Sequence, residues 1–168
     1  MTMTVYDVAV PALLRGLSNL RHILQKGEEL AEKKGIKADE LMPLRVTEDM
    51  FPLVRQVQIA CDVTKAGVAR LAGVDVPSHP DTEARYDDLY ARIEKVEAFV
   101  KSLDKQAFDG AEERDVRFRI KDTEYAFKGR EYLMHYVIPN LHFHVSTTYG
   151  LLRREGAELG KADYLGRF

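Results

Sequence analysis

Long stretches of helical periodicity are the feature that most constrains the fold of this chain. Four segments repeat apolar residues three or four positions apart, and short runs rich in glycine, proline and polar residues separate them. In the first segment, Leu13, Leu17 and Leu20 fall on one face. Helices with one apolar face pack against each other, so the pattern predicts a four-helix bundle. The predicted helices span residues 5–34, 50–72, 81–103 and 130–155.

Capping signals mark the ends of the first predicted helix. Thr4 and Asp7 have the spacing of a capping box, in which a hydroxyl and a carboxylate bond the free amides of the first turn. Gly35 follows the last periodic residue and is a plausible left-handed cap. Pro11 predicts either a kink in this helix or a later start.

Prolines locate two further boundaries. Asp49 is the predicted N-cap of the second helix, which places Pro52 in the first turn, where its missing N–H is harmless. Pro139 predicts a kink in the last helix, and Gly156 is its plausible cap.

The pattern changes before the last predicted helix. Apolar and polar residues alternate over 116–120 and again over 125–127, a period of two that is typical of β-strands. An isolated hairpin is marginal in water, so this one must pack on the helices. The predicted fold class is therefore all-α, a four-helix bundle with a short β-hairpin inserted before the last helix. The long connection 104–129 is a candidate to cross the bundle.

Length and composition fit a single domain over residues 1–168. The chain is 45% hydrophobic and 31% charged, which excludes collagen-like, disordered and disulfide-scaffold proteins. Its net charge of -2 argues against a dedicated nucleic-acid binder. No apolar run approaches the roughly 20 residues of a membrane span, and residues 1–14 lack the pattern of a signal peptide. The single Cys61 cannot form an internal disulfide, so we expect a cytoplasmic protein without membrane or nucleic-acid partners.

The last predicted helix carries the most distinctive chemistry. His144 and Asn140 are one turn apart and lie in its core-facing stripe together with Thr148. Bare burial of polar groups costs roughly a few kcal/mol, so these side chains need hydrogen-bond partners or a ligand. Gln56 and Thr64 on the second helix are candidates to complete a polar pocket around them. The alternative is that they bond backbone carbonyls.

A second stripe runs along the opposite side of the last predicted helix. A helix that is apolar on two sides is either central in a core or buried at an interface. We therefore expect this stripe to be a homodimer surface or a platform for the hairpin or the C-terminal tail. Its members are His135, Ile138, His142, Val145 and Tyr149.

The histidines lack the spacing of a metal site. His142 and His144 diverge by about 200° around a helix and cannot share one ion, and neither HxxxH nor HExxH occurs. A zinc site needs three or four convergent ligands. Packed, hydrogen-bonded rings are therefore the simpler interpretation, with a metal site at His144 as the alternative. Cys61 lies on the buried stripe of the second helix, which favours packing over a role as nucleophile.

Two blocks of sequence share the pattern of one family. The first block is DMFPLVRQVQIACD at residues 49–62, and the second is PNLHFH at residues 139–144, followed by LGKADYLG at residues 159–166. Together they resemble a bacterial and fungal family filed as a domain of unknown function. That family is grouped with the DinB-like, or YfiT-like, bundle superfamily, and the resemblance covers essentially the whole chain.

The resemblance implies a DinB-like four-helix bundle that forms a dimer. Relatives in the wider superfamily include metal-dependent thiol transferases and isomerases. Those enzymes hold a divalent metal with one histidine on the second helix and an HxxxH pair on the last. In this chain no histidine lies between Arg45 and Gly73, and the one-turn pair is Asn140 and His144. Only His144 carries over as a ligand position, so the loss of the three-histidine pattern disfavours a divalent metal cofactor.

Three functions follow as alternatives, and the sequence leaves open whether the chain is an enzyme. The first is a cytoplasmic bundle that binds a small molecule in a polar pocket near His144 and Asn140. The second is a DinB-like metal-dependent transferase with an atypical, incomplete ligand set. The third is a non-catalytic homodimeric accessory or stress protein, and the second stripe of the last helix is the observation that supports it.

Overall fold

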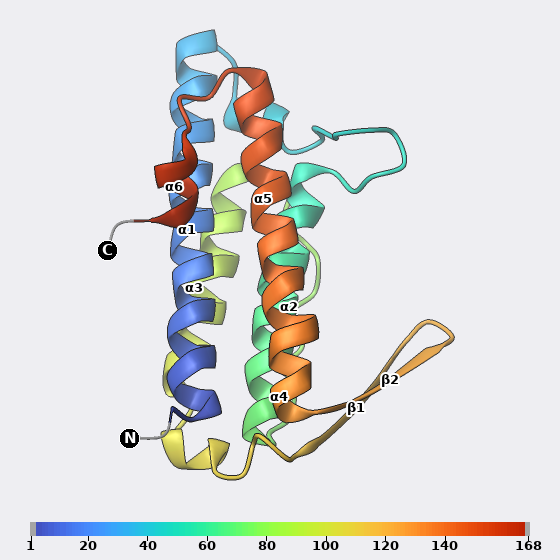
Figure 1. Ribbon diagram of the computed structural model, residues 1–168. Helices are drawn as coiled ribbons and strands as arrows, with labels where there is room; N and C mark the ends of the chain where they lie inside the picture. The colour runs from blue at the N-terminus through green and yellow to red at the C-terminus, as the bar shows by residue number, and fades with distance from the viewer. Residues whose placement is uncertain (1–2, 167–168) are drawn as a thin grey trace.

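The computed structural model describes residues 3–166, in which four long helices form a bundle (Figure 1). These are α1 (Val5–Lys34), α2 (Leu53–Ala72), α3 (Tyr86–Ser102) and α5 (Ile138–Glu155). Two 3-10 helices, η1 (Ala38–Leu41) and η2 (Lys105–Phe108), lie in the connections. The short helix α4 (Gly129–Glu131) and the π-helical segment η3 (Tyr132–Val137) precede α5, and α6 (Lys161–Leu165) follows it. The predicted all-α bundle is confirmed.

The chain runs along the bundle in the order up, down, down and up. In Figure 1, α1 and α5 rise while α2 and α3 both descend. Because α2 and α3 are parallel, the connection between them must travel the length of the bundle. It does so over residues 73–85, and the amide of Tyr86 then donates to Oδ1 of Asp39 in η1 at 2.6 Å. The crossing connection is therefore 73–85, whereas 104–129 joins α3 to α5 at one end.

The core lies where α1 and α2 each pack against both α3 and α5. Every helix contributes its predicted apolar stripe, and residues such as Leu17, Val57 and Ile93 are fully buried. The Leu141 side chain of α5 packs directly on Gly16 of α1, where an added Cβ would lie 2.6 Å from Cδ2 of Leu141. A larger residue at position 16 would therefore force the buried Leu141 side chain to move.

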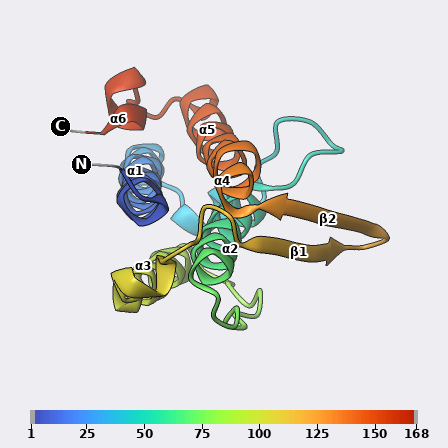
Figure 2. The same cartoon turned by 60° about the horizontal axis from the view of Figure 1, so that its bottom comes forward.

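The predicted β-hairpin is present between α3 and α5 and projects from the bundle (Figure 2). Strands β1 (Asp115–Ile120) and β2 (Thr123–Lys128) pair antiparallel, with Phe118 opposite Tyr125. Their rings pack on Tyr132 and Tyr136 of η3, with centroids 5.1 to 5.7 Å apart. The guanidinium of Arg70 lies 4.2 Å from the centroid of the Phe118 ring, and Arg70 also donates to the Tyr132 hydroxyl at 2.9 Å. The hairpin thus packs on the helices, as an otherwise marginal element must.

The predicted ends of α1 are confirmed. Thr4 and Asp7 form the capping box, and Gly35 ends the helix in the left-handed region with a φ of 67°. The helix begins at Val5 and runs through Pro11, so the alternative of a later start is wrong. Pro11 is exposed, which lets water satisfy the carbonyl that its missing N–H leaves free.

The predicted start of α2 is wrong by three residues. The helix begins at Leu53 with Pro52 as its N-cap, and Asp49 lies outside it. The Asp49 carboxylate instead accepts the hydroxyl of Thr47, two residues earlier. A local turn therefore uses the carboxylate that the sequence pattern assigned to the helix.

The predicted start of α3 is also wrong, because residues 81–83 are held by ion pairs. The guanidinium of Arg92, whose side chain is 2% exposed, binds Glu83 at 2.8 Å, Asp62 at 2.9 Å and Asp81 at 3.0 Å. These contacts fix the end of the crossing connection against α2 and α3. The helix then starts at Tyr86, where the Asp88 carboxylate accepts the amides that precede the first turn.

The last predicted helix is confirmed. Residues 129–155 are helical without a break, because α4, the π-helical segment η3 and α5 follow each other directly. Pro139 is the second residue of α5 and lies directly after the π-helical segment. Gly156 ends α5 in the left-handed region, as predicted.

The C-terminal helix α6 folds back onto α1 and α5. The hydroxyl of Tyr164 lies 2.9 Å from Nδ1 of His142, and its ring packs edge-on against Tyr149 at 6.3 Å. The C-terminal tail therefore covers part of the second stripe of the last helix. This stripe was expected to be either a homodimer surface or a platform for the hairpin or the tail, and it is a platform for the tail. The homodimer stays a prediction. No helix within residues 3–166 combines the length and the apolar character needed to cross a membrane.

Candidate functional site

Two of the predicted polar residues meet where α2 packs against α5. Nδ1 of His144 lies 2.7 Å from Oε1 of Gln56, and both side chains are buried. The amide nitrogen of Gln56 donates to the backbone carbonyl of Phe51 at 2.9 Å. Because a carbonyl oxygen only accepts, this second contact fixes the orientation of the amide. Nδ1 must then be the protonated ring nitrogen of His144, and Nε2 carries the lone pair.

The imidazole of His144 is neutral at pH 7. Burial, with a smaller contribution from the charge of Arg55, lowers the pKa of His144 to about 4. Nε2 has no hydrogen-bond partner among residues 3–166, and it is not one of the fully buried unpartnered atoms, so it retains contact with solvent. A neutral ring with one fixed N–H and one accessible lone pair is a hydrogen-bond acceptor or a base.

Two exposed phenylalanines contact this pair, Phe143 through its ring and Phe51 through its backbone carbonyl. Phe143 is 55% exposed, and its ring stands perpendicular to that of His144 with the centroids 5.2 Å apart. Phe51 is also 55% exposed, and its carbonyl holds the Gln56 amide. Sequence reasoning missed both rings because they lie outside the apolar stripes. Their positions in the sequence could have indicated them, because Phe143 directly precedes His144 and Phe51 lies five residues before Gln56.

The other predicted site residues have different partners. The side chain of Asn140 is half-buried and bonds Tyr136. The Thr148 hydroxyl donates to the backbone carbonyl of His144 at 2.9 Å. The Thr64 hydroxyl is buried without a partner among the described residues. The structure thus brings Gln56 to His144, and leaves Asn140, Thr148 and Thr64 outside that contact.

Cys61 is a packing residue in this structure. It is fully buried in the core, and burial raises the pKa of its thiol to about 12. The thiol is therefore protonated at neutral pH and out of reach of solvent, which is the opposite of what a nucleophile requires.

The residues around His144 do not fit the divalent metal of the wider superfamily. Gln56 uses its oxygen on the His144 ring and its nitrogen on Phe51, while Asn140 bonds Tyr136. Within the Gln56–His144 pair, only Nε2 of His144 remains as a metal donor. Over residues 3–166, no three His, Cys, Asp or Glu side chains gather closely enough to hold a metal ion.

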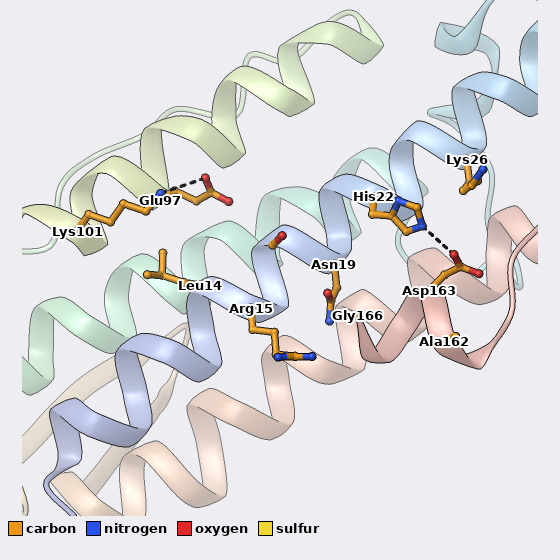
Figure 3. A pocket seen from close by; sticks show the side chains of 11 residues that line it. Leu14, Arg15, Asn19, His22, Lys26, Glu97, Lys101, Ala162, Asp163 and Gly166 are labelled. Carbon is orange, nitrogen blue, oxygen red and sulfur yellow. Dashed lines mark hydrogen bonds and ion pairs between the residues drawn. The ribbon is translucent and has the colours of Figure 1, made fainter. Parts of the chain in front are cut away.

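A groove of about 980 Å³ lies elsewhere, between α1, α3 and α6 (Figure 3). On one side, His22 points toward Asp163 of α6, and Nε2 lies 2.7 Å from Oδ1. On the other side, Lys101 and Glu97 project from α3. The groove shares no lining residue with the Gln56–His144 site. A smaller pocket of about 340 Å³ lies beside Arg92 and is likewise not lined by His144.

The bundle, its crossing connection and the inserted hairpin define the class of this protein as DinB-like. A crystal structure of a DinB family member protein from Shewanella denitrificans matches the fold with a TM-score of 0.91. The two sequences are 38% identical, and the match covers 98% of this chain and 93% of the other. Among curated proteins, a search found no match.

The model of the DUF1993 family, a domain of unknown function, matches residues 5–165. The chain belongs to this family, and the relationship expected from the two sequence blocks is confirmed.

Proposed function

We propose that the protein binds a small molecule at the exposed end of the Gln56–His144 pair. The observation that carries the proposal is the 2.7 Å contact between the two side chains, together with the second bond from Gln56 to Phe51. These contacts hold the imidazole in one tautomer and one orientation. Preorganised groups bind with less loss of freedom than mobile ones, so the fixed ring favours recognition over packing alone.

The chemistry of the site restricts the ligand. Nε2 of His144 accepts a hydrogen bond, so the ligand presents an N–H or O–H donor. The half-exposed rings of Phe51 and Phe143 offer apolar contact, which suits a planar or aromatic group. The fully buried Cys61 suits the reducing cytoplasm that we infer as the location.

Ligand-observed NMR and thermal shift with phenol, indole and benzamide test the proposal. We expect saturable binding to the wild type and a loss of affinity of about tenfold in His144→Phe, which corresponds to one lost hydrogen bond. His135→Phe is the matched control, because His135 is an exposed histidine in the adjoining segment η3. Equal binding by the wild type and His144→Phe would overturn the proposal.

A second variant keeps the test independent of folding. Phe143→Ser removes an exposed ring and leaves the core unchanged. We expect all three probes to bind this variant more weakly than the wild type, with an unchanged unfolding temperature in their absence. Unchanged probe affinity in Phe143→Ser would contradict the assigned position of the site.

A further inference from the structure

The small pocket beside Arg92 lies between the end of the crossing connection and α3. His79 lines it from the connection, and Arg92 and Lys95 line it from α3. Its volume of about 340 Å³ is at the lower end of the range for small-molecule sites. The pocket shares no lining residue with the Gln56–His144 site, so it is separate from the site proposed above.

Arg92 carries a rigidly held hydrogen-bond donor at this pocket. Its Nη1 binds Glu83 at 2.8 Å and its Nη2 binds Asp62 at 2.9 Å, and the side chain is 2% exposed. Nε is also buried, and it has no hydrogen-bond partner among residues 3–166. A guanidinium nitrogen can only donate, and a buried donor without a partner is costly. The Nε–H group of Arg92 therefore favours a guest that brings an acceptor oxygen.

Two more nitrogens at the pocket lack partners within the described part of the chain. Nδ1 of His79 is buried and unpartnered. The ammonium group of Lys95 forms no ion pair or hydrogen bond with residues 3–166. An ammonium group only donates, and Nδ1 of a histidine donates when it carries the ring proton. The hydrogen-bonding capacity that the pocket leaves unused is therefore mainly that of donors.

The two carboxylates that line the pocket already have donors of their own. Glu83 accepts from Arg92 at 2.8 Å through Oε1 and from Nε2 of Gln58 at 2.7 Å through Oε2. Oδ2 of Asp88 accepts the backbone amides of the two residues that precede α3, at 3.0 and 2.8 Å. A guest in the pocket therefore meets unpartnered donors and acidic groups that are already bonded.

The charges around His79 favour a negative guest. Burial lowers the pKa of His79, and the positive charges of Lys65, Lys95 and Arg92 lower it further. The opposing effect of Asp62 is smaller. Arg92 and Lys65 both bind Asp62 at 2.9 Å, so carboxylates already balance their charges. Lys95 has no such partner among residues 3–166, so it is the cation that a bound anion would neutralise.

We propose that the pocket beside Arg92 is a second ligand site and that it binds a short-chain carboxylate. A carboxylate has two oxygens, one to accept the Nε–H of Arg92 and one to accept the ammonium of Lys95. The ring of His79 donates as well when its proton is on Nδ1. Pro80 and Ala91, which also line the pocket, supply apolar contact for a chain of a few carbons.

Titration with propionate, followed through the histidine ring signals in NMR at constant ionic strength, tests the proposal. Propionamide is the matched probe, because it has the same shape and a carbonyl oxygen but no charge. We expect saturable shifts of the His79 signals with propionate, and binding about tenfold weaker with propionamide. The signals of His144 should stay in place, because the pocket shares no residue with that site.

A lysine variant locates the carboxylate. Lys95→Ala should weaken propionate binding about fivefold and leave the weak binding of propionamide unchanged, because only the charged probe loses an ionic partner. Lys95→Arg keeps the charge and should restore most of the affinity. The matched control is Lys101→Ala, which removes an exposed lysine from the same helix outside this pocket.

Three results would overturn the proposal. The first is the absence of saturable His79 shifts with propionate up to about 100 mM, a generous limit for so small a ligand. The second is equal binding of propionate and propionamide, and the third is an equal loss of affinity in Lys95→Ala and Lys101→Ala. None of these outcomes bears on the binding of phenol, indole and benzamide at His144, so the two proposals fail separately.

Discussion

Nδ1 of His144 and Oε1 of Gln56 lie 2.7 Å apart and join α5 to α2 inside the bundle. Gln56 is 1% exposed and His144 is 7% exposed, so little water competes for the bond. A buried hydrogen bond of this kind contributes modestly when made, but leaving one partner unpaired costs more. The pair therefore fixes the orientation of the imidazole, because any other ring orientation would leave a buried polar group without a partner.

Breaking the pair from one side should destabilise the protein. Gln56→Leu leaves the Nδ1–H of His144 buried without an acceptor, which should lower the free energy of unfolding by about 1–3 kcal/mol. His144→Phe should have a similar effect, and the double variant should cost less than the sum by about 1 kcal/mol. Urea unfolding of the four proteins measures this coupling. Strictly additive costs would show that the two side chains do not interact.

Acid should destabilise the protein through His144. Its folded pKa of about 4 lies below the usual value of 6.5, so the unfolded chain takes up the proton first as the pH falls. The contribution of the neutral His144 ring to the free energy of unfolding is complete above pH 6.5. It is lost between pH 6.5 and 4, and its magnitude is about 3 kcal/mol. Urea unfolding at neutral and acid pH should therefore show a smaller loss in His144→Phe than in the wild type. If both proteins lose the same amount, the ring is not held neutral by the fold.

Two buried threonines should respond in opposite directions to the same substitution. Thr64→Val removes a buried hydroxyl without a partner among the described residues, so it should leave stability unchanged or raise it by about 1 kcal/mol. Thr148→Val removes a hydroxyl that bonds the carbonyl of His144, so it should cost about 1 kcal/mol. Thermal unfolding of both variants makes the comparison. A marked destabilisation by Thr64→Val would reveal a partner for that hydroxyl.

Arg92 should be among the most sensitive charged positions. Arg92→Leu leaves the carboxylates of Asp62, Asp81 and Glu83 without their shared cation, and breaking its buried pair with Glu83 costs about 3–5 kcal/mol. The control is Arg85→Ala, because the pair of Arg85 with Asp87 is exposed and is worth about 0–1 kcal/mol. Denaturant unfolding should separate the two variants clearly, and similar stabilities would argue against the ion-pair account of the crossing connection.

Local signals predicted much of the fold. The capping box at Thr4 and Asp7, the left-handed caps at Gly35 and Gly156, and the strand alternation around Phe118 depend on neighbouring residues, and the structure confirms them. The start of α3 could not be predicted in this way. It depends on ion pairs of Asp81 and Glu83 with Arg92, which lies inside α3 itself.

The candidate site was predicted in part. Helical spacing placed His144 in the core-facing stripe of the last helix and Gln56 at the flank of the stripe on the second helix, and the two side chains meet where these helices pack. The π-helical segment η3 has no distinct sequence signal, and it sets the register of Tyr136, the partner that Asn140 takes in place of His144. The groove beside His22 also escaped prediction, because it exists only once α6 folds back onto α1.

The tautomer and pKa of His144 show whether the fold holds this ring neutral and in one orientation. Nitrogen-15 NMR of the imidazole, followed from neutral to acid pH, measures both quantities in the native protein. We expect a ring with its proton on Nδ1 and a pKa of about 4 in the wild type, and a raised pKa in Gln56→Glu, where a carboxylate faces the ring. A proton on Nε2, or titration of the wild type at the ordinary pKa of 6.5, would contradict it.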